Sequence, residues 1–351
     1  MSSCCAPRCS RLAPEEDAPV KHFTDLAQFS REQVLELLAL AQRLQEHPEP
    51  QALAGKILGL VFMNPSLRTL ASFQAGMARL GGSSFVITPG QGTWQLETRD
   101  GVIMDGAAAE HVKEGIPVLA SYCDALGIRM FADGKDLAAD IADGRFAQMA
   151  ALAGKPVINL ESAVNHPCQA LADWKTLEDL KVPRRARFVL SWAQHPRALP
   201  LAVPAATAHM AALRGMELTI LRPEEFALPA PIMARVHAAA ELSGGSVRES
   251  TDRAEALEGA QVLYAKEWGC TQPYGDATAD AAARHRYPDW CVRPDWFARA
   301  APECHLMHCL PVRRNVAISD AVLDGAHSVV LRQAHNRLSA QMAVLYSLLK
   351  G

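Results

Sequence analysis

The chain has 351 residues, of which 49% are hydrophobic and 21% are charged, and its formal net charge at pH 7 is −3. This is the composition of an ordinary globular protein, and the length favours two domains over one. No long block of Lys and Arg occurs, and every apolar run is much shorter than the ~18 residues that span a bilayer. The composition therefore predicts neither nucleic acid nor membrane as a partner.

Residues 1–19 differ from the rest, because Cys4, Cys5 and Cys9 stand among prolines, serines and charges. The segment lacks the apolar core of a signal peptide. The 9 cysteines of the chain are odd in number and irregularly spaced, which argues against a disulfide framework and favours a reducing cytoplasm. We expect a disordered extension here, with a metal site at the three cysteines as the weaker alternative.

From about residue 21 onward, strand-like apolar runs alternate with segments of helical periodicity, which predicts an α/β fold with parallel sheets. The expected helices cover residues 30–44, 66–80, 110–122, 145–153, 167–180 and 336–349. The expected strands cover residues 56–63, 84–88, 125–131, 156–160, 187–192, 217–221, 261–265 and 303–310. Residues 89–105 read as a long polar loop that contains Trp94. We place a domain boundary near His166.

The stretch 64–69, Asn-Pro-Ser-Leu-Arg-Thr, joins a strand to a helix. Asn64 is the expected N-cap and Pro65 the first helical residue. The free backbone N–H groups of such a turn, together with Ser66, Arg68 and Thr69, suit a phosphate. An ordinary capped helix with a surface arginine explains the stretch equally well when it is taken alone.

Polar clusters follow apolar runs at five places, and ligands of parallel sheets bind beyond the ends of strands. These clusters are Ser66/Arg68/Thr69, Arg129, Glu161/His166/Gln169, Lys266 and residues 308–311. Five such clusters favour a shared cleft. The glycine-rich fingerprints of nucleotide-binding loops are absent from the sequence, which disfavours a nucleotide cofactor.

In this order the clusters resemble those of the aspartate/ornithine carbamoyltransferase family. Residues 66–69 look like its carbamoyl-phosphate signature, 166–169 (His-Pro-Cys-Gln) like its H-P-x-Q, and 308–311 (His-Cys-Leu-Pro) like its H-C-L-P. A closer resemblance, to the N-acylornithine carbamoyltransferases, rests on residues 64–69, 104–106, 264–268 and 309–315. The resemblance runs from about residue 21 to the C-terminus.

This resemblance implies two doubly wound parallel-sheet domains and a C-terminal helix that returns to the first. Residues 20–165 with helix 333–351 would bind carbamoyl phosphate, and residues 166–332 would bind the acylornithine. It further implies a cytoplasmic homotrimer with shared active sites, acting in arginine biosynthesis, in which Trp94 reaches the adjacent subunit's site. The expected partners are small-molecule substrates, and no metal or cofactor is required.

The implied reaction is attack of a δ-amino group on carbamoyl phosphate, with phosphate leaving. Arg129, His166 and Cys309 would be catalytic, the first two by donating to the carbonyl oxygen and Cys309 through its backbone carbonyl. The implied carbamoyl-phosphate-binding residues are Ser66, Leu67, Arg68, Thr69, Trp94, Arg129, His166, Gln169, Cys309, Leu310 and Arg337. The implied acylornithine-binding residues are Glu161, Lys266 and Ala109.

Three of these residues have simpler explanations when each is taken alone. His166 before a proline is typical of a helix cap, and Arg129 at a strand end of an ion pair. Cys309 follows an apolar run with no arranged base, so we interpret its side chain as a buried small hydrophobe rather than a nucleophile. Within the full constellation, function is the better explanation for His166 and Arg129.

Lys266 favours a blocked amino acid as the substrate. Ornithine carbamoyltransferases present an acidic residue and an S-M-G segment to the α-ammonium, whereas residues 265–269 here are Ala-Lys-Glu-Trp-Gly. A lysine attracts a carboxylate and repels an ammonium, and acylation of the α-amino group removes that repulsion.

The acyl group is predicted from Ala109. Acetyl-preferring relatives carry a glutamate three residues after a Met-Asp-Gly that matches residues 104–106, and this chain has Ala109 there. A carboxylate would repel the second carboxylate of a succinyl group, so we expect N-succinylornithine, with N-acetylornithine as the alternative.

Leu70 departs from the family pattern, in which the phosphate signature continues with an arginine. Because position 70 falls on the apolar stripe of the expected helix, the missing arginine is interpreted as a structural ion-pair residue. The departure leaves a non-catalytic, anion-binding homologue as an alternative, beside a carbamoyltransferase for another blocked amine.

Overall fold

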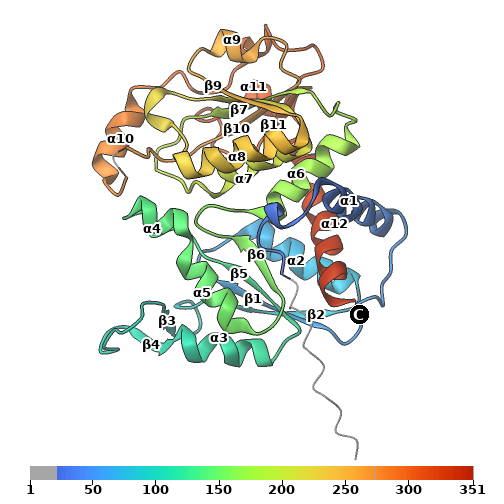
Figure 1. Ribbon diagram of the computed structural model, residues 1–351, viewed down its shortest axis with the longest axis vertical. Coiled ribbons are helices and arrows are strands. Elements are labelled where there is room, and N and C mark those ends of the chain that lie inside the picture. The colour runs from blue at the N-terminus through green and yellow to red at the C-terminus, as the bar shows by residue number, and fades with distance from the viewer. Residues whose placement is uncertain (1–21, 273, 351) are drawn as a thin grey trace, which may run out of the picture.

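The computed structural model describes residues 22–272 and 274–350, in which two parallel sheets are each flanked by helices (Figure 1). The expected extension at residues 1–19, with its cysteines, lies outside the described residues. Within the described part of the chain, none of the helices combines the length and the apolar character needed to cross a membrane.

The first sheet has four parallel strands in the order β2-β1-β5-β6. They are β1 (Ile57–Phe62), β2 (Ser83–Ile87), β5 (Ala125–Arg129) and β6 (Val157–Glu161). Its accompanying helices are η1 (Leu26–Gln28), α1 (Arg31–Glu46), α2 (Leu67–Arg79), α3 (Val112–Ser121), α4 (Leu137–Ala142) and α5 (Gly144–Ala153). Strands β1, β5 and β6 are continuous apolar runs because both faces of the sheet are covered. The chain order reverses between β1 and β5, which is where open α/β sheets bind ligands.

The second sheet has five parallel strands in the order β11-β10-β7-β8-β9. They are β7 (Arg187–Trp192), β8 (Glu217–Leu221), β9 (Ser246–Ser250), β10 (Val262–Lys266) and β11 (His305–Met307). Its helices are α6 (Pro167–Asp179), α7 (Ala202–Arg214), η2 (Glu224–Phe226), α8 (Ala230–Ser243), α9 (Arg253–Leu257), α10 (Ala277–His285), η3 (Pro294–Phe297) and α11 (Asp320–Leu323). Strand β9 was not expected, because it is a largely exposed edge strand without an apolar run.

Helix α12 (Val330–Leu349) leaves the second sheet and packs against α1, α2 and α6, as Figure 1 shows in red. This return confirms the expected fold class of two parallel-sheet α/β domains joined by a C-terminal helix. The expected start at Asn336 is wrong, since α12 begins at Val330.

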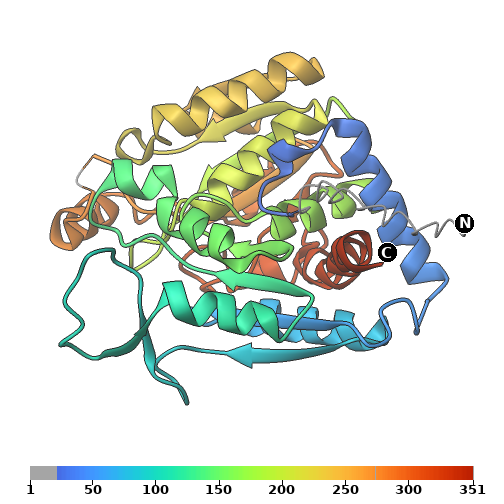
Figure 2. The same ribbon diagram turned by 60° about the horizontal axis from the view of Figure 1, so that its bottom comes forward.

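The expectation of a plain loop over residues 89–105 is also wrong. It contains β3 (Gln95–Glu97), which pairs with β4 (Ala108–His111) in a separate two-stranded sheet. Both strands are short and largely unburied, so they lack the apolar alternation by which strands are recognised. Figure 2 shows the segment around this small sheet, in teal, standing away from the body of the molecule.

Candidate active site

The site begins at one edge of the first sheet, where three strands end side by side. Phe62 at the end of β1 pairs in register with Arg129 at the end of β5, and Arg129 pairs with Glu161 at the end of β6. Because the strands are parallel, their carboxyl ends meet at the same edge. Strand register therefore brings together two residues that lie 32 positions apart in the chain, Arg129 and Glu161.

Helix α2 begins at the same edge, and its N-cap is Ser66, whose hydroxyl accepts a hydrogen bond from the backbone N–H of Thr69 (3.3 Å). The expectation that Asn64 caps this helix is wrong. The Asn64 side chain instead accepts from the backbone N–H of Phe131 (2.8 Å), beyond β5, and Ser66 is left to cap the helix. The first backbone N–H groups of α2 still face the cleft, as an anion site requires.

Three arginines from separate elements line this cleft: Arg68 from α2, Arg129 from β5 and Arg337 from α12. Each has a buried Nε for which residues 22–272 and 274–350 supply no hydrogen-bond partner, and Arg337 donates to the Thr69 hydroxyl (2.6 Å). Burial and the neighbouring arginines lower the pKa of Arg68, and lower that of Arg337 to about 10. Buried donors and crowded positive charge of this kind are satisfied by a multivalent anion.

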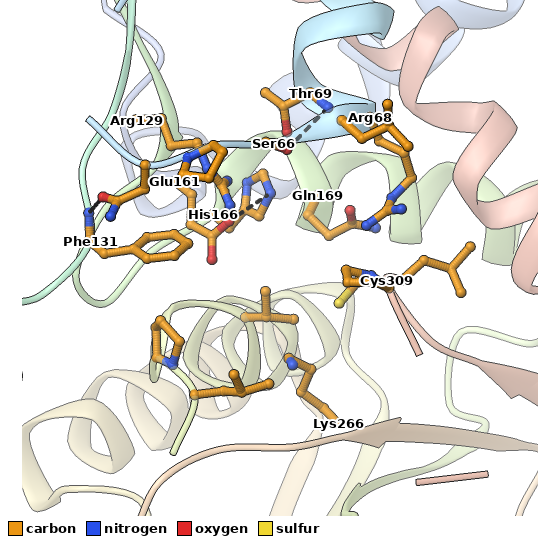
Figure 3. A pocket seen from close by; sticks show the side chains of 18 of the residues that line it. Ser66, Arg68, Thr69, Arg129, Phe131, Glu161, His166, Gln169, Lys266 and Cys309 are labelled. Carbon is orange, nitrogen blue, oxygen red and sulfur yellow. Dashed lines mark hydrogen bonds and ion pairs between the residues drawn. The ribbon is translucent and has the colours of Figure 1, made fainter. Parts of the chain in front are cut away.

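Glu161 and His166 stand next to Arg129 in Figure 3. The Glu161 carboxylate forms an ion pair with Arg129 and lies 3.6 Å from His166 Nε2. His166 is the N-cap residue of α6, but its side chain makes no capping hydrogen bond, which argues against a purely structural cap. Burial, then Arg337, Arg129 and Arg68, hold the pKa of His166 well below its ordinary value. The imidazole is therefore neutral and can donate one hydrogen bond to an oxygen on which negative charge develops.

The segment 308–311, here called the 308–311 wall, lines another side of the cleft with Cys309, Leu310 and Pro311. Cys309 is buried, and burial raises the pKa of its thiol to about 11, so the thiol is protonated at neutral pH. This agrees with our interpretation of the side chain as a small hydrophobe. Leu310 has φ +55°, in the left-handed region that non-glycine residues rarely adopt.

Lys266 lies across the cavity from these groups, as Figure 3 shows. It is the last residue of β10 and pairs in register with Trp192 of β7. Its Nζ lies 3.0 Å from Glu267 Oε2. Burial alone would lower the pKa of Lys266, but Glu267, Cys309 and Glu161 together raise it, so the side chain is charged. A buried ammonium with one acidic partner retains donors for an incoming carboxylate.

A single cavity of about 650 Å³ joins these groups. The predicted site residues that line it are Ser66, Leu67, Arg68, Thr69, Arg129, Glu161, His166, Gln169, Lys266, Cys309, Leu310 and Arg337. Two predicted residues, Trp94 and Ala109, do not line it. Trp94 is 60% exposed and its indole Nε1 donates to Glu110 (2.7 Å), while Ala109 is exposed on β4.

Several residues that line the cavity were not predicted as site residues, and among them are Phe131, His195 and Arg313. The Arg129 guanidinium lies over the Phe131 ring, 4.6 Å from its centre. Arg313 Nε donates to His195 Nε2 (3.2 Å), and burial lowers the pKa of His195. Because His195 follows the end of β7 by three residues, the rule of strand ends could have found it.

Within residues 22–272 and 274–350, no group of three or more His, Cys, Asp or Glu side chains is arranged to hold a metal ion. The cleft itself presents mainly cations and neutral donors.

Comparison with known proteins agrees with this geometry. Residues 21–179 match the domain described as "Aspartate/ornithine carbamoyltransferase, carbamoyl-P binding domain", and residues 203–348 match the "Asp/Orn binding domain" of the same family. The chain belongs to the aspartate/ornithine carbamoyltransferase family. The protein is thus a carbamoyltransferase.

Within the family, the chain is 35% identical over 333 residues to the N-acetylornithine carbamoyltransferase of Xanthomonas campestris, with 94% of this chain and 98% of that one covered. It is 36% identical over 296 residues to the N-succinylornithine carbamoyltransferase of Bacteroides thetaiotaomicron, with 84% and 88% covered. The predicted resemblance to the N-acylornithine enzymes of this carbamoyltransferase family is confirmed.

Solved structures of these carbamoyltransferases share the fold. Acetylornithine transcarbamylase complexed with acetylcitrulline has a TM-score of 0.91 and 35% identity, with 95% of this chain and 100% of that chain covered. A glutamate-to-alanine mutant of N-acetyl-L-ornithine transcarbamylase, complexed with carbamyl phosphate and N-succinyl-L-norvaline, has a TM-score of 0.90, with 35% identity and 94% and 100% covered.

Proposed function

We propose that the protein transfers the carbamoyl group of carbamoyl phosphate to the δ-amino group of an N-acyl-L-ornithine. The products are the N-acyl-citrulline and phosphate, as a step of arginine biosynthesis. The observation that carries this proposal is the opposition of Arg68 and the charged Lys266 across one cavity (Figure 3), which Arg337 also lines. One wall suits the phosphate of the donor, and the other suits the carboxylate of the acceptor.

The donor half of the reaction uses groups on the first domain, His166 at the start of α6 and the C-terminal helix. The N-terminus of α2, Arg68 and Arg337 hold the phosphate, whose charge falls where free donors already converge. Arg129 and neutral His166 donate to the carbonyl oxygen as the δ-amine adds to the carbonyl carbon. The C–O bond to phosphate then breaks, and the departing phosphate accepts the proton of the amine.

The acceptor half favours a substrate whose α-amino group is blocked. Among the described residues that line the cleft, Glu161 is the one carboxylate, and it is paired with Arg129. A free α-ammonium would therefore meet Lys266 and Arg313 without an available acidic partner. Acylation removes that charge and leaves the α-carboxylate, which these two cations attract.

Succinyl is the acyl group that we favour, and acetyl is the second candidate because both kinds of relative match the chain. The relatives support the argument from Ala109 in one respect. Mutants of N-acetyl-L-ornithine transcarbamylase in which a glutamate is replaced by alanine, proline, serine or valine are complexed with N-succinyl-L-norvaline. Loss of a glutamate thus accompanies an N-succinyl ligand in that enzyme, and this chain has no glutamate at position 109.

The test compares initial rates of N-acyl-citrulline formation from N-succinylornithine and N-acetylornithine, followed by mass spectrometry. We expect wild type to prefer N-succinylornithine, and Ala109→Glu to lower that rate by about tenfold or more through charge repulsion. Ala107→Glu is the matched control, because it adds the same charge two residues away. A preference for acetyl that Ala109→Glu leaves unchanged would contradict the succinyl assignment.

We also propose a homotrimer in which the segment of β3 and β4 completes a neighbouring site. The proposal is supported by Trp94, which directly precedes β3 and donates to Glu110 of β4, and by Ala109 of β4, since neither lines the cavity of its own chain. Sizing chromatography with light scattering would give the mass of three chains. A monomer that is fully active would contradict the role of Trp94.

A further inference from the structure

A buried carboxylate behind the cleft is not used by the mechanism above. Asp173 lies one turn after Gln169 on α6 and is fully buried. Its Oδ1 accepts hydrogen bonds from Gln169 Nε2 and Gln333 Nε2, both at 2.7 Å, and its Oδ2 accepts from the Tyr264 hydroxyl (3.0 Å). The carboxylate thus joins α6, α12 and β10 at one point.

The hydrogen bond that Gln169 donates to Asp173 determines the orientation of the Gln169 amide. Burial raises the pKa of Asp173 to about 6, so the carboxylate is ionised at neutral pH. An ionised carboxylate can only accept hydrogen bonds, so Gln169 must present its NH₂ to Asp173 and its carbonyl oxygen elsewhere. That oxygen, Oε1, is buried without a partner among the described residues, and Gln169 lines the cleft. An unsatisfied buried acceptor next to a cationic wall suits a ligand NH₂, such as that of a carbamoyl group.

Asp173 also holds the side-chain amide of Gln333, which connects it to the 308–311 wall. Gln333 Oε1 accepts from the backbone N–H of His308 (2.8 Å), at the start of the 308–311 wall. Leu310 N–H donates to His308 Nδ1 (2.9 Å), so the ring proton is on Nε2, which lies 3.2 Å from Glu267. Glu267 in turn holds Lys266. A continuous chain of contacts therefore runs from Gln169, on the side of the cleft proposed for carbamoyl phosphate, to Lys266, on the side proposed for the acylornithine.

We propose that Asp173 is a positioning residue that fixes the amide of Gln169 and, through Gln333, the 308–310 backbone, so that acceptors face the NH₂ of the bound carbamoyl group. Asp173 does not line the cleft, and its hydrogen bonds to described residues go to Gln169, Gln333 and Tyr264 rather than to Arg68 or Arg337. The inference rests on the proposed function, because it assigns the NH₂ of carbamoyl phosphate to Gln169.

The proposed role of Asp173 predicts different effects on the binding of carbamoyl phosphate and of inorganic phosphate. Carbamoyl phosphate needs both the cradle and the oriented acceptors, whereas inorganic phosphate needs the cradle alone. Asp173→Leu is nearly isosteric but removes the acceptor, so the Gln169 amide is no longer held in one orientation. Asp173→Asn keeps one oxygen for the two glutamines, and its NH₂ can donate to the Tyr264 oxygen.

The experiment measures kcat/KM for carbamoyl phosphate, with N-succinylornithine as acceptor, and the inhibition constant of inorganic phosphate for both variants. For Asp173→Leu we expect kcat/KM to fall by about 100-fold, while the phosphate constant changes by less than about threefold. Asp173→Asn recovers kcat/KM to within about fivefold of wild type. The proposal would be overturned if Asp173→Leu weakened the use of carbamoyl phosphate and the binding of phosphate by the same factor. It would also be overturned if kcat/KM fell as far in Asp173→Asn as in Asp173→Leu.

Two controls keep the result interpretable. Thermal melting shows whether Asp173→Leu folds; if it does not, Gln333→Met replaces it, with the same expected split between carbamoyl phosphate and phosphate. The Asn variant is decisive in either case, because a loss of about 100-fold there contradicts the orientation argument. Wild type that binds phosphate but transfers no carbamoyl group would refute the proposed function instead.

Discussion

Arg68 is the side chain that most directly tests the phosphate wall. It projects from the first turn of α2 with a buried Nε that has no hydrogen-bond partner in the part of the chain that the structure describes. We expect Arg68→Gln to raise KM for carbamoyl phosphate by about 10- to 100-fold, because a charge-assisted hydrogen bond to the phosphate is lost. Steady-state kinetics at saturating acylornithine would measure this.

The matched control is Arg79→Gln, which removes the same charge from the exposed last turn of the same helix. It should leave KM for carbamoyl phosphate within about twofold of the wild-type value, since an exposed charge more than a Debye length from the phosphate site is screened. An equal rise in KM for both variants would show that net charge, rather than the cradle, is responsible.

Lys266 tests the acceptor wall. Lys266→Gln keeps a hydrogen-bond donor but removes the charge that the proposed α-carboxylate meets. We expect kcat/KM for the acylornithine to fall by about 100-fold while the inhibition constant of phosphate stays unchanged, because loss of one partner of a buried charge pair is costly. A variant that retains the wild-type preference and rate for acylornithines would remove Lys266 from the site.

At the scale of single residues, the sequence allows the meeting of side chains at strand ends to be predicted, but not the position of side chains on the connecting segments. Arg129, Glu161 and Lys266 follow apolar runs, and parallel register alone brings such residues to one edge. His195 stands beyond β7 and was overlooked because an apolar Ala193 and a glutamine intervene. Trp94 and Ala109 depend on β3 and β4, whose placement no local periodicity records.

At the scale of elements, helix α2 carries the departure from the family pattern. Leu70 is half-buried and packs against the hydrophobic core, as the apolar stripe predicted. We expect Leu70→Arg to lower the free energy of unfolding by about 1–2 kcal/mol, because a charge replaces packed apolar surface, and to leave kcat within about threefold.

Urea unfolding and steady-state rates on the same preparation would check this. A large gain in kcat with Leu70→Arg would show instead that the missing arginine limits catalysis, and would revive the interpretation of a weakened homologue.

Buried polar contacts explain which element boundaries were missed. The first turns of α12 carry Gln333 and Asn336, which are buried because they bond to Asp173 and to Thr176 of α6. Buried polar residues do not contribute to the hydrophobic periodicity by which a helix is predicted. The helix was therefore expected to begin at Asn336, whereas it begins at Val330. The cap of α2 was misplaced for a similar reason, since a long-range bond to Phe131 engages Asn64.

At the scale of the whole molecule, the two sheets present their carboxyl ends to one cavity, and α12 ties the second half back to the first. The alternation of apolar runs predicted the fold class, because both sheets are buried between helices. The small β3–β4 sheet was unpredicted for the opposite reason, since most of its surface is exposed.

Stability should depend on pH through His209, which is buried on α7 and faces Asp25 and Arg235. Burial lowers its pKa to about 4. The folded state therefore binds fewer protons than the unfolded state below pH 6.5, and stability is lost as the pH falls toward 4. The loss attributable to this group is about 3 kcal/mol.

Unfolding free energies of wild type and His209→Gln at pH 7 and pH 4 would test this. The variant should lose about 3 kcal/mol less on acidification, while all other titrating groups act equally in both proteins. Parallel pH dependence of the two proteins would contradict the assignment.

The central claim is that the cleft carbamoylates an ornithine whose α-amino group is blocked. It is tested most directly by the ratio of kcat/KM for N-succinylornithine to that for L-ornithine, at saturating carbamoyl phosphate. We expect a ratio of about 1,000 or more, because the free α-ammonium meets two cations without an acidic partner. A ratio near one, or a preference for L-ornithine, would contradict it.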